Sequence, residues 1–434
     1  MAVTETMHVS WFERLGSVFK GIIIGFILIA VGIGLLFWNE GRTIKRYKDL
    51  KEGESNVVLS SSDLVHAENE GKLVYMTGKA TTEETLTDDE FNVSVNAIKL
   101  ARDVQMYQWY EESDSHTQRN LGGSEETVTT YTYKKDWYGQ VVDSTSFKES
   151  GHDNPSSMAY TSNAWTASNV TLGAYRMSSS LVGKMNSFSQ FPIKAEPASP
   201  APAAPTAPEA APAVPAANPA APAVPTTPVD APVSQPVGAD AATATSEPAI
   251  PAPTDPAKAS EQNDRKVYQN GYYIGKDPAK PEIGDLKISF RVVVPMEVSI
   301  VSQQQGDTFV PYQAKNGTVE LLDSGIVSCQ QMFAQAQSQN KFMAWILRAI
   351  GFILILVGFN MIFAPLKVLA DVIPFLGSLV GMGTGFVSFI LAGSVSLITI
   401  SIGWLSYRPF IGVPLLILAI AALVWLFMKG KSAK

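Results

Sequence analysis

Few side chains in this sequence have the types and spacing that acid–base or metal chemistry needs. His152 is the strongest candidate, because it lies beside Asp153 and Asn154 in the run Gly-His-Asp-Asn-Pro. A hydrogen-bonded turn and a catalytic or ligand-binding histidine are both compatible with this pattern, and the turn is the commoner of the two. No two histidines have the His-x-x-x-His spacing of a helical metal site. The four are His8, His66, His116 and His152.

The acidic and sulfur-bearing residues give equally weak signals for chemistry. Glu68 and Glu70 flank Asn69 before a predicted strand, where two carboxylates could hold a cation but more often form a solvated turn. The single cysteine, Cys329, excludes an intrachain disulfide and a thiolate metal site. The Gly-x-Ser-x-Gly motif of hydrolases is absent. We therefore predict a protein that is not an enzyme and that holds no cofactor and no metal.

Long apolar runs are the elements that organise the chain, at 18–38, 344–363, 384–405 and 409–428. Each has about the 20 residues that a helix needs to cross the hydrocarbon core of a bilayer. The first run is followed by Asn39 and Glu40 rather than by a small-residue cleavage site, so we expect a retained signal anchor. The centres of the runs lack the ionisable residues that mark ion paths, and Arg348 is expected to snorkel to the interface.

The fold class predicted is an α+β membrane protein with four transmembrane helices, one N-terminal and three C-terminal. A large β-rich extracytoplasmic domain is inserted between spans one and two. Because long domains translocate largely regardless of charge, we expect both termini in the cytoplasm and the large domain on the lumenal or periplasmic side. The net charge of −7 has no basic block, which argues against a nucleic acid partner.

The hydrophilic region divides by composition. Runs rich in β-branched and aromatic residues predict strands before and after a segment that holds 17 of the 27 prolines. That segment should be disordered and locally extended, and it serves either as a tolerated insertion or as a spacer that docks on a partner. A helix should couple the β-rich domain to span two. An interfacial or re-entrant segment, broken by Pro365 and Pro374, should join spans two and three.

The predicted boundaries are a tail at 1–17, span one at 18–38, a first β-rich segment at 39–195, a Pro/Ala-rich linker at 196–258, a second β-rich segment at 259–327, a connecting helix at 328–343, span two at 344–363, an interfacial or re-entrant segment at 364–383, spans three and four at 384–405 and 409–428, and a cytoplasmic tail at 429–434. Small residues repeat every fourth position in two of these segments, which favours close packing of helices. The packing candidates are Gly21, Gly25, Gly377, Gly381 and Gly385.

Several short motifs, in this order and at these distances from the spans, resemble the LUMA family, transmembrane protein 43. They are Asn39-Glu40-Gly41-Arg42, Glu70-Gly71, Tyr107-Gln108-Trp109, His152, Asn154-Pro155, Gly284-Asp285 and Trp404 with Tyr407-Arg408-Pro409. The Pro/Ala-rich segment departs from the animal members, which have a short connection there. Inserts of this kind are frequent in bacterial envelope proteins, so we expect a bacterial member of the family.

The resemblance implies a four-span protein that self-associates and organises membrane protein complexes, with no assigned catalytic residues. Its partners would be the lipid bilayer, further copies of itself and other membrane proteins. In an animal source the resemblance also implies the endoplasmic reticulum and inner nuclear membrane, with lamins and emerin as partners. In a bacterium the inner membrane replaces these.

Two hypotheses are compatible with this sequence. The first is a scaffold that self-associates through its glycine-lined spans and organises proteins or membrane structure. The second is a membrane-anchored ligand-binding or sensor module, with a site near His152 and the aromatic strand around Trp109; an enzyme is a weaker form of the second. The first predicts defined oligomers, and the second predicts a concave site in the β-rich domain.

Overall fold

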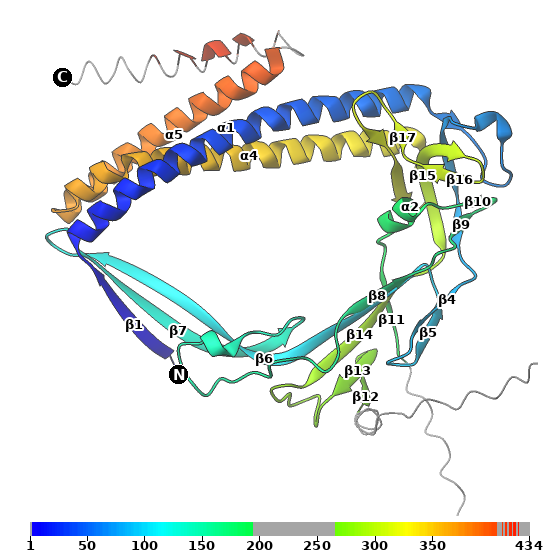
Figure 1. Ribbon diagram of the computed structural model, residues 1–434, viewed down its shortest axis with the longest axis horizontal. Coiled ribbons are helices and arrows are strands. Elements are labelled where there is room, and N and C mark those ends of the chain that lie inside the picture. Colours follow the sequence, from blue (N-terminus) through cyan, green and yellow to red (C-terminus); the bar gives the residue numbers. More distant parts are fainter. Residues whose placement is uncertain are drawn as a thin grey trace, which may run out of the picture. The chain divides into compact units, whose positions relative to one another are not determined.

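The computed structural model describes residues 2–193 and 265–405, together with a few helical residues between 410 and 424 (Figure 1). Its mixed helix and sheet composition agrees with the predicted α+β class. The predicted linker at 196–258, the tail at 429–434 and most of the predicted fourth span at 409–428 lie outside the described residues.

Three helices within the described residues are long and apolar enough to span a membrane. They are α1 (Trp11–Asn56), α4 (Cys329–Ala370) and α5 (Pro374–Leu405). A capping box starts α1, in which the Ser10 hydroxyl accepts from Glu13 N–H and the Glu13 carboxylate accepts from Ser10 N–H. Both α1 and α4 continue without a break beyond their apolar runs, so each joins the hydrophobic segment directly to the β-rich domain.

Glycine allows α1 and α4 to lie side by side at close range. A Cβ atom at Gly25 would lie 2.7 Å from the Gly358 carbonyl oxygen, and one at Gly32 would lie 2.9 Å from the Gly351 carbonyl oxygen. Gly21 is looser, 3.5 Å from the Met361 side chain. This close approach of two backbones is the geometry that small residues permit in apolar helix pairs. Leu36 of α1, Ile355 of α4 and Ala392 of α5 form the buried centre of the three-helix contact.

The segment expected to be interfacial or re-entrant, 364–383, is divided between two helices. Pro365 lies inside α4, which continues to Ala370, and Pro374 opens α5 after a turn of three residues. The expectation that both prolines break the chain is wrong for Pro365. Proline is tolerated inside long apolar helices when the freed backbone groups are satisfied locally, and it is preorganised for the first helical position that Pro374 takes.

One sheet of eight strands contains the longest hairpin of the described residues. Its path is β1-β7-β6-β14-β13-β12, and β11 and β8 pair with β14 and β6. The strands are β1 (Ala2–Val9), β6 (Lys99–Arg119), β7 (Glu125–Tyr138), β8 (Asn163–Thr166), β11 (Ser189–Phe191), β12 (Arg265–Tyr268), β13 (Gly271–Ile274) and β14 (Leu286–Val293). Because β14 pairs with β6, the segments before and after the Pro/Ala-rich region share one sheet.

The second sheet of the described residues has seven strands in the order β19-β15-β16-β10-β9-β3-β2, and an added β15–β3 pairing closes a circuit through β16, β10 and β9. The strands are β2 (Val58–Leu59), β3 (Leu73–Thr81), β9 (Thr171–Leu172), β10 (Tyr175–Arg176), β15 (Met296–Gln305), β16 (Thr308–Val310) and β19 (Leu321–Ser324). Two small hairpins, β4 (Thr85–Asp88) with β5 (Val93–Asn96) and β17 (Tyr312–Gln313) with β18 (Thr318–Val319), and helix α2 (Ser179–Lys184) complete the domain.

Two hydrophobic clusters hold this domain together and attach it to the helices. The larger one lies between the sheets, with Leu100 of β6, Phe290 of β14 and Ile300 of β15 fully buried. Alternate residues of β14 are buried, as expected for a strand with one face on a core. The smaller cluster packs Leu50 of α1 and Phe333 of α4 against the second sheet.

Residues 2–9 are not a free tail. They form β1, which pairs antiparallel with β7 over eight residues, from Ala2 opposite Thr132 to Val9 opposite Glu125. A backbone ladder of this length holds the N-terminal strand against the β-rich domain. The structure therefore disagrees with a tail that lies across the membrane from that domain. Nothing in the charge pattern of residues 1–17 indicates this pairing.

The close α1–α4 contact predicts a position-specific effect of adding bulk. Gly32→Leu should lower the free energy of unfolding by about 1–3 kcal/mol, because the new side chain has to displace Ile355 and the Gly351 backbone. Gly34→Leu is the matched control, since nothing lies within 4 Å of a Cβ atom there. Thermal unfolding of the detergent-solubilised variants measures both. Equal effects of the two substitutions would contradict the packing described.

Candidate functional site

A buried carboxylate marks the point where the apolar helices meet the β-rich domain. Glu40 of α1 is almost completely buried. Arg348 of α4 donates two hydrogen bonds to it, from Nε to Oε1 at 2.7 Å and from Nη2 to Oε2 at 2.9 Å. Trp404 of α5 donates from Nε1 to Oε2 at 2.5 Å. One carboxylate thus connects all three long helices, and the bidentate pairing with Arg348 is the strong form of such a bond.

Aromatic rings surround the arginine in this cluster. The Arg348 guanidinium carbon lies 5.0 Å from the Trp345 ring centre and 5.4 Å from that of Trp404. Gly403 permits the close approach of α5, because a Cβ atom there would lie 2.9 Å from the Glu40 Cβ. Arg348 was expected to reach the membrane interface, and in the structure its charge is paired with Glu40 within the protein. A paired, hydrogen-bonded charge of this kind can be buried, whereas an isolated one is expelled.

Amide side chains bond α1 to α4 beside this cluster. Asn39 Nδ2 donates to the Ala344 carbonyl at 3.0 Å, and Asn340 Nδ2 donates to the Thr43 carbonyl at 2.9 Å. Glu40 and Asn340 line one side of a hollow of about 480 Å³ that Trp345 and Trp404 also line. The arrangement fixes the two helices in register at the polar end of their apolar runs.

A second buried charge cluster lies at the other end of the α1–α4 pair. Asp371, at the end of α4, has a fully buried side chain, and its Oδ2 lies 2.6 Å from Arg14 Nη2 and 3.4 Å from Arg119 Nε. Glu125 Oε1 lies 2.9 Å and 3.0 Å from the same two nitrogens. Arg119 and Glu125 flank the tip of the β6–β7 hairpin. Four charges that sum to zero therefore join that tip to both helices.

Backbone contacts complete this second cluster. Trp11 Nε1 donates to the Val368 carbonyl at 2.9 Å, and Gly122 N–H donates to the Val372 carbonyl at 3.1 Å. Gly123 has a positive φ of 82° and lies against the Trp11 ring, so a side chain at that position would both be strained and collide.

The Asp371 carboxylate constrains its own surroundings as well. A Cβ atom at Gly377 would collide with this carboxylate, so only glycine fits at that position. The spacing of Lys367 and Asp371 is that of a helical ion pair. The carboxylate pairs with Arg14 and Arg119 instead, and Lys367 lies against Gly381.

The predicted aromatic strand and His152 lie together in the β-rich domain. His152 stacks on Tyr133 with ring centres 4.0 Å apart and meets Trp109 edge-on at 4.6 Å. Asn154 accepts from Trp109 N–H at 2.8 Å and donates to the Trp109 and Val142 carbonyls. Gln108 is fully buried, accepts from Val142 N–H and donates to the Gln140 carbonyl. These side chains fasten the loop after β7 to β6.

The remaining predicted motif residues also make local structural contacts. Glu70 accepts from Gly306 N–H at 2.8 Å, and Gly71 and Gly284 have positive φ angles. Asp285 accepts from the Tyr273 hydroxyl at 2.5 Å. Burial first, and then this bond to the carboxylate, raises the pKa of Tyr273. Within the described residues, no group of three or more His, Cys, Asp and Glu side chains could hold a metal ion.

Other predicted residues do not gather at one place. Gly381 lies against the Lys367 side chain, and nothing lies within 4 Å of a Cβ atom at Gly385. Pro155 approaches Gly284, and Tyr107 contacts Trp137. Gly41 has open space, and Arg42 lines a separate hollow. Tyr407, Arg408 and Pro409 lie outside the described residues. Arg14, Arg119, Glu125 and Asp371 were missed, because only tertiary structure brings them together from three distant segments.

Comparison with known proteins gives a consistent result. The family model described as Transmembrane protein 43 matches residues 106–409. Transmembrane protein 43 of Mus musculus is 29% identical over 423 residues, which cover 94% of this chain and 89% of the mouse protein. The Homo sapiens protein is 28% identical over 424 residues, with 94% and 89% covered. The Drosophila melanogaster homolog is 26% identical over 424 residues, with 95% and 96% covered. No solved structure matches the chain.

The buried carboxylate predicts a large loss of stability when its charge is removed. Glu40→Gln leaves the Arg348 charge buried and unpaired, which should cost about 3–5 kcal/mol. Glu54→Gln, an exposed site on the same helix, should stay within about 0.5 kcal/mol of the parent. Thermal unfolding in detergent measures both. The double variant Glu40→Gln with Arg348→Leu should lose less than the two single losses combined, and full additivity would contradict a direct pair.

Proposed function

Because the chain belongs to the transmembrane protein 43 family, we propose that it is a non-enzymatic membrane protein that self-associates through its apolar helices. In this role its β-rich domain organises other membrane proteins or the membrane itself. The functional motifs support a structural role, since Glu40, Gln108 and Asn154 each use their polar atoms to join separate segments of the chain. The partners in this proposal are lipid, further copies of the chain and other membrane proteins.

The observation that carries the proposal is an exposed stripe on α4. Ile346, Ile350, Ile353 and Val357 are each between 38% and 54% exposed, and Asn360 is also exposed. Their spacings of four, three, four and three residues follow the heptad pattern that places side chains in the seam between two helices. The opposite face of α4 is occupied by α1 and α5. The stripe therefore offers a helical face of the correct spacing to a second copy.

Asn360 gives this stripe its specificity. An amide group within a long apolar helix is costly to expose to hydrocarbon, because lipid tails supply no hydrogen-bond partner. An asparagine from a second helix supplies that partner, and such bonds contribute about 0.6–2 kcal/mol in membranes. A single polar residue in an apolar seam also fixes register and the number of helices that join. The proposal thus favours a defined oligomer over open-ended association.

The helix–domain junction would transmit such an assembly to the β-rich domain. Leu50 near the end of α1 and Met332 and Phe333 near the start of α4 are buried in one cluster with strands of the second sheet. Neither helix has a break between this cluster and its apolar run. Helices that associate in the membrane would therefore array their β-rich domains in a fixed geometry, which is what a scaffold requires.

The placement of the chain relative to the membrane is included in this proposal. The β6–β7 hairpin contacts the start of α1 through Arg14, while the second sheet packs on Leu50 near its end. Open sheet edges do not cross hydrocarbon, and β1 is the edge strand of this hairpin. We accordingly place the N-terminal strand, the hairpin and the rest of the β-rich domain on one side of the membrane. In this arrangement α1, although long enough to span, lies along the membrane with both ends on that side and does not cross it.

Self-association through α4 is tested by the mass of the particle. Light scattering, corrected for bound detergent, should give a discrete multimer for the parent chain. Asn360→Leu should shift it toward the monomer, because the seam loses its hydrogen bond. Val31→Leu, at an exposed apolar position of α1, is the control and should leave the mass unchanged. A parent chain that remains monomeric both in detergent and in lipid nanodiscs would overturn the proposal.

A further inference from the structure

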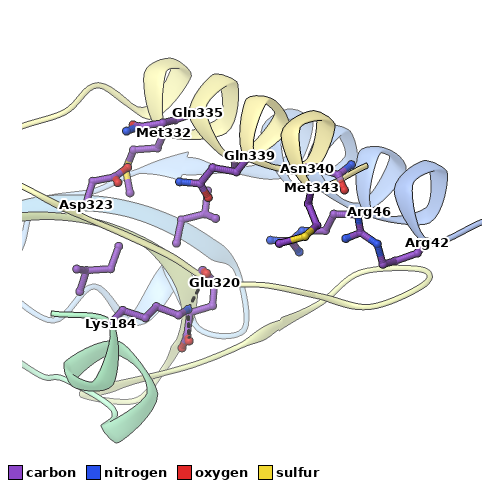
Figure 2. Close-up of a pocket in the computed structure, with 13 residues that line it drawn as sticks. Arg42, Arg46, Lys184, Glu320, Asp323, Met332, Gln335, Gln339, Asn340 and Met343 are labelled. Atoms are coloured by element: carbon purple, nitrogen blue, oxygen red, sulfur yellow. Dashed lines mark hydrogen bonds and ion pairs between the residues drawn. The ribbon is translucent and has the colours of Figure 1, made fainter. Parts of the chain in front are cut away.

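Two arginines lie one helical turn apart just beyond the first apolar run. Arg42 and Arg46 of α1 line a hollow of about 450 Å³, which Asn340 and Met343 of α4 close on another side (Figure 2). Across the hollow, Lys184 and Glu320 form an ion pair at 2.6 Å. The arginines begin four residues after Trp38, so they lie at the level where the apolar stretch of α1 gives way to the polar stretch.

Asp49 attracts the Arg46 charge, but the Arg42 guanidinium is left partly without hydrogen-bond partners within the described residues. The Nε and Nη2 groups of Arg42 are buried and have no hydrogen-bond acceptor there. Arg46 donates to a neutral group, the Thr318 carbonyl, at 2.6 Å. A guanidinium group whose buried N–H groups lack acceptors is a costly arrangement that an anionic ligand would relieve.

The nearby carboxylates accept hydrogen bonds from groups other than Arg42. Asp49 accepts from the backbone and side-chain nitrogens of Asn316 at 3.0 Å and 2.8 Å. Glu320 is held by Lys184. Burial raises the pKa of Asp323, the other acid that lines the hollow. Arg42 therefore keeps buried N–H groups without an acceptor, which an anion can satisfy.

The surroundings of the arginines indicate that this anion is amphiphilic. Arg42, Lys45 and Arg46 also line an adjoining hollow of about 570 Å³, together with Phe37, Trp38 and the acid Asp49. Both aromatic side chains are more than half exposed. Exposed aromatic residues next to a row of basic residues are the arrangement that meets lipid head groups at a membrane surface. A free phosphate ion would make no use of the aromatic wall.

We propose that Arg42 and Arg46 bind the phosphate of an anionic phospholipid, with its acyl chains along α1 beside Phe37 and Trp38. The forked guanidinium groups suit a phosphodiester, because each presents several N–H donors in a fixed plane. Lys45 adds charge at the rim, and Gln339 and Asn340 supply amide groups toward the polar end of the head group. The site places one lipid where α1, α4 and the β-rich domain meet.

Lipid retention on the purified full-length chain tests this site. The protein is extracted from vesicles of equal amounts of phosphatidylglycerol and phosphatidylcholine, and the lipid that remains bound is counted by native mass spectrometry. The parent should retain phosphatidylglycerol in preference to phosphatidylcholine. Arg42→Gln with Arg46→Gln should weaken that retention by about tenfold or more, since two charge-assisted contacts are lost. Lys51→Gln, an exposed cation further along α1, is the matched control and should retain lipid as the parent does.

Two further measurements separate loss of the lipid site from misfolding and separate a lipid from a free phosphate ion. Arg42→Lys keeps the charge but loses the fork, so it should retain an intermediate amount of phosphatidylglycerol and unfold at the parent's temperature. Titration with inorganic phosphate should raise the thermal midpoint much less than vesicles of phosphatidylglycerol do. Undiminished retention in the double Gln variant would overturn the proposal. A phosphate effect equal to the lipid effect would overturn the assignment to a lipid.

Discussion

The buried contact between Asp371 and Arg14 is the interaction on which the arrangement of the helices and the hairpin depends. It joins the first turns of α1 to the short turn before α5, and Arg119 and Glu125 extend it to the tip of the β6–β7 hairpin. The four charges cancel at a site that excludes water from the Asp371 carboxylate, so removing Arg14 leaves Asp371 with only the partly exposed Arg119 as a counter-charge. The N-terminal strand β1 runs directly from this cluster along β7.

A second buried carboxylate, Glu40, lies at the opposite end of the α1–α4 pair from Asp371. Glu40 connects α1 to α4 through Arg348 and to α5 through Trp404, close to where Leu50 and Phe333 enter the β-rich domain. Between the two clusters, the α1–α4 contact is made of glycine against backbone and needs no polar groups. The helices are thus fixed at both ends by specific charges and along their length by close packing. Such a frame suits a protein whose role is to hold others in position.

The sequence predicted much of this at the level of elements and little at the level of contacts. Apolar runs and β-branched alternation identified the long helices and the strands, because both signals are local. The sequence shows the two motifs that contain Glu40 and Trp404 but not the contact between these residues, because that contact depends on how α5 crosses α1. Proline usually interrupts a helix, but Pro365 lies inside α4, a long apolar helix in which neighbouring helices support the chain. The β-branched residues of β1 are compatible with a strand, but its pairing with β7 left no local signal, since it consists of backbone hydrogen bonds between distant segments.

The placement of both ends of α1 on the same side of the membrane is tested most directly by two-sided labelling. In a Cys329→Ser background, single cysteines are placed at the exposed positions Thr4 of β1 and Glu54 near the end of α1. Sealed, right-side-out and inverted vesicles are then treated with a membrane-impermeant maleimide. We predict that both cysteines react in the same vesicle orientation and that neither reacts in the other. Reaction of Thr4→Cys and Glu54→Cys in opposite orientations would contradict this placement. It would also mean that β1 does not pair with β7 when the protein is in the membrane.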